Sequence, residues 1–193
     1  MSDLHRCHWV TQDPIYLEYH DKVWGRPVTD AQELFAKLCL DGQQAGLSWL
    51  TILKKQANYE QAFCHFDPRK ISRFDEQDVE RLLQNPGIVR NRLKVASIIR
   101  NARAYIAMTE QGVDFSDFLW QFTDGRSIQN RWQEPGQVPV TTPASDAMSK
   151  ALKQQGFNFV GSTICYAFMQ AVGMVNDHLT CCHCYEEVSA LGR

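Results

Sequence analysis

Cysteine and histidine residues gather at both ends of this 193-residue chain. Cys7 and His20 lie near the start, and His178 and Cys182 lie near the end, at the i, i+4 spacing that places two side chains on one face of a helix. A set of four thiolate and imidazole groups is typical of tetrahedral Zn²⁺. Because four protein ligands leave no open coordination position, such a site would be structural.

The residues alone leave other ligand sets open. Further candidates lie close to the four in sequence: His5, His8, Cys181, His183 and Cys184. One alternative is a loose cysteine cluster that binds nothing specific. Another is a redox pair formed by Cys181 and Cys184, which the sequence does not favour because no thioredoxin-like βαβ pattern surrounds it.

Large aromatic residues crowd the first fifty positions around a carboxylate, Asp41, and the polar stretch 42–48. Any single large aromatic side chain is more often a core residue than a ligand contact. Together with a carboxylate, aromatic faces form a slot that favours a flat, cationic ring. Enzymes that act on a base in duplex DNA flip the base into such a pocket. The aromatic residues of this candidate slot are Trp9, Tyr16, Tyr19, Trp24 and Trp49.

Residues 82–90 connect two predicted helices through a tight Pro-Gly turn. This arrangement resembles the helix–hairpin–helix motif, which holds the DNA backbone through N–H groups at a helix N-terminus. Gly87, Arg90 and Lys94 are the candidate phosphate contacts. Five basic residues and no acidic residue lie between positions 88 and 105, although the second glycine usual in this motif is absent. The alternative is an ordinary helix turn with a solvated basic face.

The net charge of −2 is unevenly distributed along the chain. Residues 1–53 carry −3 (four basic, seven acidic), residues 54–105 carry +5 (eleven basic, six acidic), and residues 106–193 carry −4 (five basic, nine acidic). Phosphate neutralisation depends on local Lys and Arg residues. The acidic total therefore does not exclude a nucleic-acid partner, and the basic segment is the one that contains the hairpin.

Composition limits the class of protein. A hydrophobic fraction of 44% and a charged fraction of 22% are typical of globular proteins and exclude disordered, collagen-like and disulfide-stapled classes. We find no signal peptide and no apolar run of about 18 residues, so we expect a cytoplasmic protein with no membrane partner. The seven cysteines cannot all pair, and we expect them to be reduced.

The elements that must position these residues are predicted to be helices, in an all-α fold with a single domain over 1–193. An N-terminal arm with one helical turn precedes them. The stretch 123–144 contains three prolines and is predicted to be a surface excursion or a linker between two helical lobes. Spacing and capping residues predict a helix over 31–41 after an Asp30 N-cap and another over 145–156 with a Ser145 N-cap. A short helix is predicted to begin at residue 68. Further helices are predicted over 48–63, 75–84, 90–108, 114–122 and 159–173.

Several longer motifs are similar to those of a known family, the constitutive bacterial type I 3-methyladenine DNA glycosylases. The similarity spans roughly residues 6–185. Its most specific parts are Gly42-Gln43-Gln44-Ala45-Gly46-Leu47-Ser48-Trp49 and the motifs between 156 and 178. Other matching motifs are Cys7-His8-Trp9-Val10, Tyr19-His20-Asp21, Phe66-Asp67-Pro68, Asn101-Ala102-Arg103-Ala104-Tyr105 and Asn176-Asp177-His178.

The resemblance implies a helix–hairpin–helix glycosylase fold in which one structural zinc joins the N- and C-terminal segments. It implies that the protein, as a monomer, flips 3-methyladenine out of alkylated double-stranded DNA and hydrolyses its N-glycosidic bond, leaving an abasic site. The base is the product. The zinc ligands that the resemblance implies are Cys7, His20, His178 and Cys182.

The resemblance also implies roles for the residues of the candidate slot. Trp49 stacks on the flipped base, and Trp9 and Trp24 shape the walls. Tyr19 supplies a hydroxyl and Asp41 meets the amine edge of the base, which makes these two the catalytic candidates. The residues that fill the gap left in the DNA are Gln44, Gly46 and Leu47.

This sequence departs from the family pattern at Asp41, where the family has Glu. Aspartate is one methylene shorter and loses roughly 1.5 Å of reach. We therefore expect weaker or altered base affinity. Two other classes of protein remain as alternatives: a non-catalytic helix–hairpin–helix DNA-binding module, and a zinc-dependent hydrolase, which would need an open coordination position.

Overall fold

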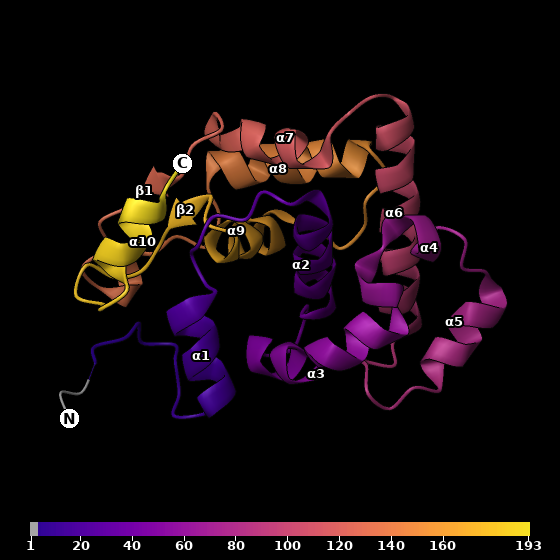
Figure 1. The fold of residues 1–193 in the computed structure, drawn as a ribbon, viewed down its shortest axis with the longest axis horizontal. Coiled ribbons are helices and arrows are strands. Elements are labelled where there is room, and N and C mark those ends of the chain that lie inside the picture. The colour runs from indigo at the N-terminus through magenta and orange to yellow at the C-terminus, as the bar shows by residue number, and fades with distance from the viewer. Residues whose placement is uncertain (1–3) are drawn as a thin grey trace.

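The computed structural model describes residues 4–193, and this part of the chain is mainly helical, as the sequence predicted (Figure 1). Two short strands, β1 (Ile128–Gln129) and β2 (Val175–Asn176), pair in parallel, with Ile128 opposite Val175. The 3₁₀ turns are η1 (Cys64–Phe66), η2 (Gln121–Thr123) and η3 (Pro135–Gln137). The helices are α1 (Pro14–Lys22), α2 (Ala31–Gln43), α3 (Trp49–Ala62), α4 (Pro68–Ile71), α5 (Glu76–Leu83), α6 (Arg92–Glu110), α7 (Phe115–Trp120), α8 (Pro143–Gln154), α9 (Ser162–Ala171) and α10 (Tyr185–Leu191).

Side-chain caps determine where the helices begin. The Asp30 carboxylate accepts the Glu33 N–H at 2.9 Å at the start of α2, which confirms the predicted N-cap. The predicted Ser145 N-cap of α8 is wrong, because Thr142 occupies that position. Ser145 lies three residues later, where its hydroxyl accepts the Thr142 N–H at 2.8 Å. Pro143, which suits the first helical position, is the local signal for this start.

The buried side chains form two hydrophobic clusters. The larger one surrounds α2 and α9, which lie at the centre of the molecule (Figure 1). The smaller one joins α1 to the C-terminal segment and includes Tyr19, Trp24 and Leu179. Trp49, the first residue of α3, packs against both clusters. The start of α3 is therefore the place where the two clusters meet.

The stretch 123–144 packs against the C-terminal segment and does not run as an extended linker between lobes. Its strand β1 pairs with β2, and the Trp132 carbonyl accepts the Thr180 N–H at 2.9 Å. Trp132 and Asn130 donate from their side chains to Asp177 at 2.8 and 2.7 Å. The N-terminal arm also differs from expectation, because α1 has nine residues and not a single turn.

None of the helices formed by residues 4–193 combines the length and the hydropathy needed to cross a bilayer.

Candidate active site and metal-binding cluster

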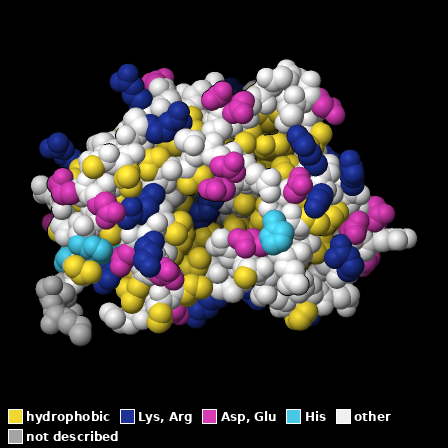
Figure 2. Space-filling view, viewed as in Figure 1, with side chains coloured by type: hydrophobic (Ala, Val, Ile, Leu, Met, Phe, Trp, Pro, Cys, Tyr) yellow, Lys and Arg dark blue, Asp and Glu magenta, His cyan; other side chains and the backbone are white. Residues whose placement is uncertain are grey.

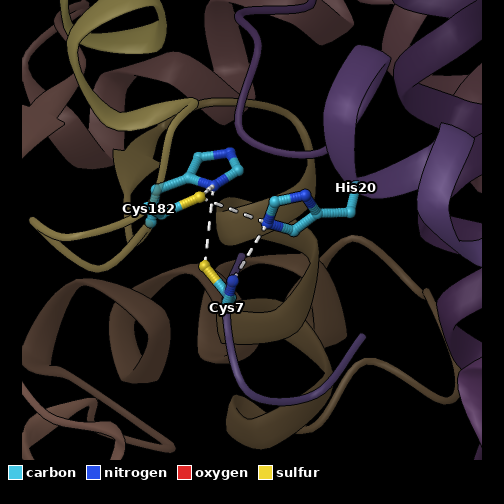
Figure 3. Close-up of side chains that lie close together, drawn as sticks. Cys7, His20 and Cys182 are labelled. Carbon is cyan, nitrogen blue, oxygen red and sulfur yellow. Dashed lines mark hydrogen bonds between the residues drawn. The ribbon is translucent and has the colours of Figure 1, made fainter. Parts of the chain in front are cut away.

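Four buried side chains from the two ends of the chain meet in one cluster (Figure 3). Cys7 precedes α1, His20 lies in α1, and His178 and Cys182 lie between β2 and α10. Their ligand atoms all lie within 4.8 Å of one another. Figure 3 shows that Cys7, His20 and Cys182 point toward a common centre.

The distances in this cluster fit a tetrahedral cation. Cys182 Sγ lies 3.4 Å from His178 Nδ1 and 3.5 Å from His20 Nε2. Cys7 Sγ lies 3.6 Å from His178 Nδ1. A tetrahedral zinc with Zn–S of about 2.3 Å and Zn–N of about 2.1 Å separates sulfur and nitrogen ligands by about 3.6 Å. Both the donor types and their spacing are therefore those of a four-ligand metal site.

The outer nitrogen of each imidazole is held by an acceptor, as is usual for metal-binding histidines. His20 Nδ1 lies 2.7 Å from Asp21 Oδ1, and His178 Nε2 lies 2.9 Å from the Trp24 carbonyl oxygen. The inner nitrogens, His20 Nε2 and His178 Nδ1, therefore face the cysteine sulfurs. Arg6, at 2.8 Å, holds the pKa of the Asp21 carboxyl well below its usual range, so this acceptor stays ionised.

The remaining cysteine and histidine candidates lie outside the central set. His5, His8 and Cys181 are exposed. The Nε2 atom of His183 lies 3.1 Å from Asp21 Oδ1, on the outer side of His20. Cys184 lies beside His183. The structure thus brings together the four residues that the family resemblance implied.

A cavity of about 430 Å³ lies where the two hydrophobic clusters meet. It adjoins the cysteine–histidine cluster, because the Trp24 ring lies 4.8 Å from the His178 ring and the Trp9 ring lies 5.3 Å from the His20 ring, measured between centroids. Its size is that of a small-ligand pocket. All five aromatic residues of the candidate slot line it: Trp9, Tyr16, Tyr19, Trp24 and Trp49.

Asp41 lines the cavity from the last turn of α2 and is only 3% exposed. Its Oδ1 pairs with the ammonium of Lys37, one helical turn earlier, at 3.1 Å. Its Oδ2 is buried without a hydrogen-bond partner within residues 4–193. Burial raises the pKa of Asp41 and lowers the pKa of Lys37, and each charge partly offsets the shift of the other.

Lys37 is a cavity residue that the sequence analysis missed. Its Nζ lies 3.2 Å from the centroid of the Trp49 ring, a close cation–π contact. The sequence signal was available in part, because Lys37 and Asp41 have the i, i+4 spacing of a helical ion pair. The position of the ammonium over Trp49 depends on how α3 packs against α2, which the sequence does not show.

Tyr19 and Trp49 form one wall of the cavity, with ring centroids 5.6 Å apart. Burial, together with the nearby Asp41 charge, raises the pKa of Tyr19 well above its usual value, so its hydroxyl stays protonated. The indole Nε1 of Trp49 is buried without a partner among the described residues. Together with Asp41 Oδ2, the cavity wall therefore contains an unpaired donor and an unpaired acceptor.

Asp177 is a second buried carboxylate on the cavity lining, and the sequence analysis gave it no role. Its oxygens accept hydrogen bonds from Tyr166 at 2.5 Å and Gln170 at 3.0 Å, in addition to those from Asn130 and Trp132. Two of these donors lie on α9 and two lie in the stretch 123–144. This carboxylate is therefore fully paired and joins the cavity wall to the stretch 123–144.

The hairpin between α5 and α6 is built differently from the phosphate grip that the sequence predicted. The Gly87 N–H donates to Asn85 Oδ1 at 2.8 Å, and the Gly87 carbonyl accepts from Asn58 at 3.1 Å. Lys94 is buried and donates to the carbonyls of Gln43 and Ala45 at 2.8 and 2.6 Å. Both groups are thus occupied within the protein.

Most basic side chains near the hairpin are also paired internally. Arg92 pairs with Glu76 and Glu80, and Arg100 donates to the Gly156 carbonyl. Arg103 donates to the carbonyls of Ser72 and Phe74. Figure 2 accordingly shows positive and negative side chains intermixed over this face. Arg90 is exposed, and no hydrogen bond within residues 4–193 uses the backbone N–H groups of Arg90, Arg92 or Leu93.

A short turn between α2 and α3 carries the other DNA-side candidates, Gln44, Gly46 and Leu47. Gln44 lines the cavity, and its carbonyl accepts the Leu47 N–H at 2.6 Å. Gly46 has φ +79°, a conformation that glycine adopts without strain. The Leu47 side chain is 40% exposed.

The site therefore combines an aromatic cavity with a buried carboxylate whose Oδ2 has no partner within residues 4–193. The sequence model of the methyladenine glycosylase family matches residues 9–185. The chain therefore belongs to the methyladenine glycosylase family.

Individual relatives cover nearly the whole chain. The chain is 53% identical to DNA-3-methyladenine glycosylase 1 of Escherichia coli (strain K12) over 182 residues, which is 94% of this chain and 97% of that protein. A crystal structure of 3-methyladenine DNA glycosylase I has a TM-score of 0.93 and 56% identity, covering 94% of this chain and all of that one. The Staphylococcus aureus enzyme, solved to explain 3-methyladenine recognition, has a TM-score of 0.90 and 39% identity, covering 93% of this chain and 96% of that one.

Proposed function

We propose that this protein is a monofunctional DNA repair glycosylase that hydrolyses the N-glycosidic bond of 3-methyladenine in alkylated double-stranded DNA and leaves an abasic site. The observation that carries the proposal is the unpaired, buried Oδ2 of Asp41 in an aromatic cavity. A buried acceptor without a partner is costly, and the exocyclic amine of a flipped adenine supplies the missing donor. The names of the relatives support the choice of base.

In this proposal the cavity residues bind and orient the base. Trp49 stacks on one face of the ring, and Trp9 and Trp24 limit its position from the sides. The Tyr19 hydroxyl and the Asp41 carboxylate are the catalytic groups, because they contact the reacting base. The Trp49 indole N–H is a further donor toward a ring nitrogen or toward Tyr19.

The chemistry needs little assistance because methylation at N3 gives the base a positive charge. When the C1′–N9 bond breaks, its electron pair neutralises the base, and a water oxygen forms the new bond to C1′ and releases a proton to the solvent. The contribution of the protein is to bind the base more tightly as this bond stretches. Asp177, already paired to four donors, adds a fixed negative charge to the cavity wall.

The DNA-side contacts are proposed for the rim of the cavity and the hairpin. Leu47 enters the gap left by the flipped base, and Gln44 and Gly46 shape the turn that carries it. At the hairpin, a phosphate meets the Arg90 guanidinium and the free N–H groups at the start of α6. Gly87 and Lys94 act by holding the hairpin in place, because their polar groups are already bonded within the protein.

We further propose that the four-residue cluster holds one structural zinc ion. When bound, zinc supplies a crosslink between the two ends of the chain. Cys7 and His20 bring the N-terminal arm, and His178 and Cys182 bring the C-terminal segment. Because Trp9 and Tyr19 lie on the arm, the cluster positions two walls of the cavity. With four protein ligands, the alternative of a zinc-dependent hydrolase loses its open coordination position.

The partners in this proposal are alkylated duplex DNA and released 3-methyladenine, and the protein acts as a monomer in the cytoplasm of a bacterium, where the DNA is. The test is incubation with methylated DNA followed by identification of the released bases. Release of 3-methyladenine with intact phosphodiester bonds supports a monofunctional glycosylase. Tight binding to DNA without release supports the non-catalytic helix–hairpin–helix module instead.

A further inference from the structure

The cavity of this protein contains a cation of its own. The Lys37 ammonium lies 3.2 Å from the centroid of the Trp49 ring and 3.1 Å from Asp41 Oδ1. It also lies 5.4 Å from the centroid of the Tyr19 ring. These three residues are the ones that bind the base in the proposed function. The ammonium thus makes the same two kinds of contact, with an aromatic face and with a carboxylate, that a cationic base would make.

The positions of the ammonium and of a stacked base exclude each other. Atoms in contact across an aromatic face are separated by about 3.5–4.0 Å. The Lys37 nitrogen lies at 3.2 Å above the middle of the Trp49 ring, so it occupies the layer that a base stacked on Trp49 would fill.

We propose that Lys37 controls access to the base slot: its ammonium holds the stacking position over Trp49, and every base that enters must displace it. This inference rests on the proposed function, because it takes Trp49 as the stacking residue. Lys37 competes with the base and takes no part in bond breaking.

A second cavity gives the displaced side chain a place to go. It has a volume of about 420 Å³, and Tyr19, Lys37 and Trp49 line both cavities. This second cavity is also lined by Glu33, which lies one helical turn before Lys37, and by Glu60 of α3. Figure 2 shows hydrophobic side chains exposed in a hollow over the region between α1, α2 and α3. Lys37 therefore pairs with Asp41 in the base slot, while Glu33 lines the second cavity on the other side.

Competition for the slot and simple charge repulsion predict different changes in ligand affinity when Lys37 is replaced. If the ammonium must leave, its removal improves the binding of cationic and neutral bases by the same factor, since both need the slot empty. If the ammonium stays near a bound base, its removal improves the binding of the cationic base alone. The two cases are separated by one pair of ligands, 3,9-dimethyladeninium, which is a fixed cation, and 9-methyladenine, which is neutral.

The experiment measures the affinity of both ligands by NMR titration for the wild type, Lys37→Met and Lys37→Gln. We expect Lys37→Met to bind both ligands about 30-fold more tightly, the size of one desolvated cation–π contact. Lys37→Gln, which keeps a polar partner for Asp41, should lie in between and serves as the test if Lys37→Met is unstable. Lys150→Met, on the exposed face of α8, is the matched control and should change nothing.

Three results would overturn the inference: unchanged affinity, weaker affinity in both Lys37 variants, or a gain for the cationic ligand only. Glu33→Gln gives an independent check, because it removes a carboxylate from the second cavity and should weaken the binding of both ligands. Release of 3-methyladenine from methylated DNA is measured on the same wild-type sample. If release fails, the proposed function is wrong; if release occurs but affinities do not change, only the role of Lys37 is wrong.

Discussion

The aromatic cavity and the α5–α6 hairpin were both expected to contact the substrate, yet they are built in opposite ways. In the cavity, polar atoms of Asp41 and Trp49 are buried and unpaired. At the hairpin, the polar groups of Gly87, Lys94 and Arg92 are already bonded to other parts of the protein. A buried atom without a partner indicates a missing ligand more directly than a count of charged residues does.

The same contrast corrects the interpretation of charge along the sequence. The net charge of +5 over residues 54–105 correctly indicated the segment that contains the hairpin. Most basic side chains near the hairpin, however, bond to other parts of the protein and stabilise the fold. The −3 of residues 1–53 includes Asp41, a buried carboxylate of the cavity lining whose Oδ2 has no partner within residues 4–193. The predictions below treat the cavity and the hairpin as separable.

The largest effect is expected for Trp49→Leu. Loss of the stacking surface should reduce excision of 3-methyladenine by up to about 100-fold, because base–aromatic stacking contributes about 1–3 kcal/mol. Affinity for undamaged DNA and its dependence on salt should not change. The measurements are single-turnover excision and DNA binding at several salt concentrations. If Trp49→Leu weakened binding to all DNA equally, the cavity and the hairpin would not be separate sites.

Removal of the metal should have the next largest effect. Chelation, or Cys182→Ser, should loosen the N-terminal arm and weaken binding of free 3-methyladenine roughly tenfold, since metal affinity contributes to the stability of the segments it joins. Hydrogen exchange should show loss of protection around Cys7 and His178 while α6 stays protected. Cys64→Ser, which lies outside the cluster, is the control. A metal-free protein with unchanged exchange and base affinity would contradict the crosslink.

A smaller effect is expected for Asp41→Glu. The added methylene extends the carboxylate by roughly 1.5 Å toward the base, so affinity for free 3-methyladenine should rise several-fold. Calorimetric titration of the free base measures it. Unchanged affinity would show that the reach of this carboxylate does not limit binding.

The smallest effect is expected at the hairpin. Arg90→Ala should weaken binding to all DNA sequences a few-fold and reduce the slope of log affinity against log salt by about one. Arg92→Ala is the matched control, and its effect on the slope should be smaller because Glu76 and Glu80 already hold that guanidinium. Equal slopes for the two variants would show that internal pairing does not decide which arginine meets phosphate.

Lys94→Met extends this comparison from binding to stability. Two charge-assisted hydrogen bonds to carbonyls at the end of α2 are lost, so the thermal midpoint should fall. The salt slope should stay the same. A reduced salt slope with an unchanged thermal midpoint would indicate that Lys94 contacts phosphate.

The parts of the fold that depend on neighbouring residues were predictable from the sequence. The Asp30 cap of α2 follows from residues three apart, and the helical pattern after Ser48 predicts α3. The five slot aromatics could be grouped because they are close in sequence to Asp41. The residues that meet in the cysteine–histidine cluster could not be chosen from spacing alone, because the choice among neighbouring cysteines depends on how the two chain ends meet. The family resemblance supplied that choice.

Features that depend on the packing of distant helices could not be predicted. Lys94 looks like a surface residue in sequence, and it is buried only because α6 passes the end of α2. The Lys37–Asp41 pair is visible as a spacing, but the placement of its ammonium over Trp49 is set by the contact between α2 and α3. The pairing of Asp177 requires the stretch 123–144 to pack against the C-terminal segment.

The central claim is that the cavity around Asp41 and Trp49 binds and releases the methylated base. The most direct test identifies the bases released from methylated duplex DNA by the wild type and by Asp41→Asn, which keeps the shape but removes the charge. The account predicts 3-methyladenine from the wild type and at least about tenfold slower release by Asp41→Asn, the size of one lost hydrogen bond to a charged group, with unchanged binding to undamaged DNA. No release by the wild type, or equal release by both proteins, would contradict it.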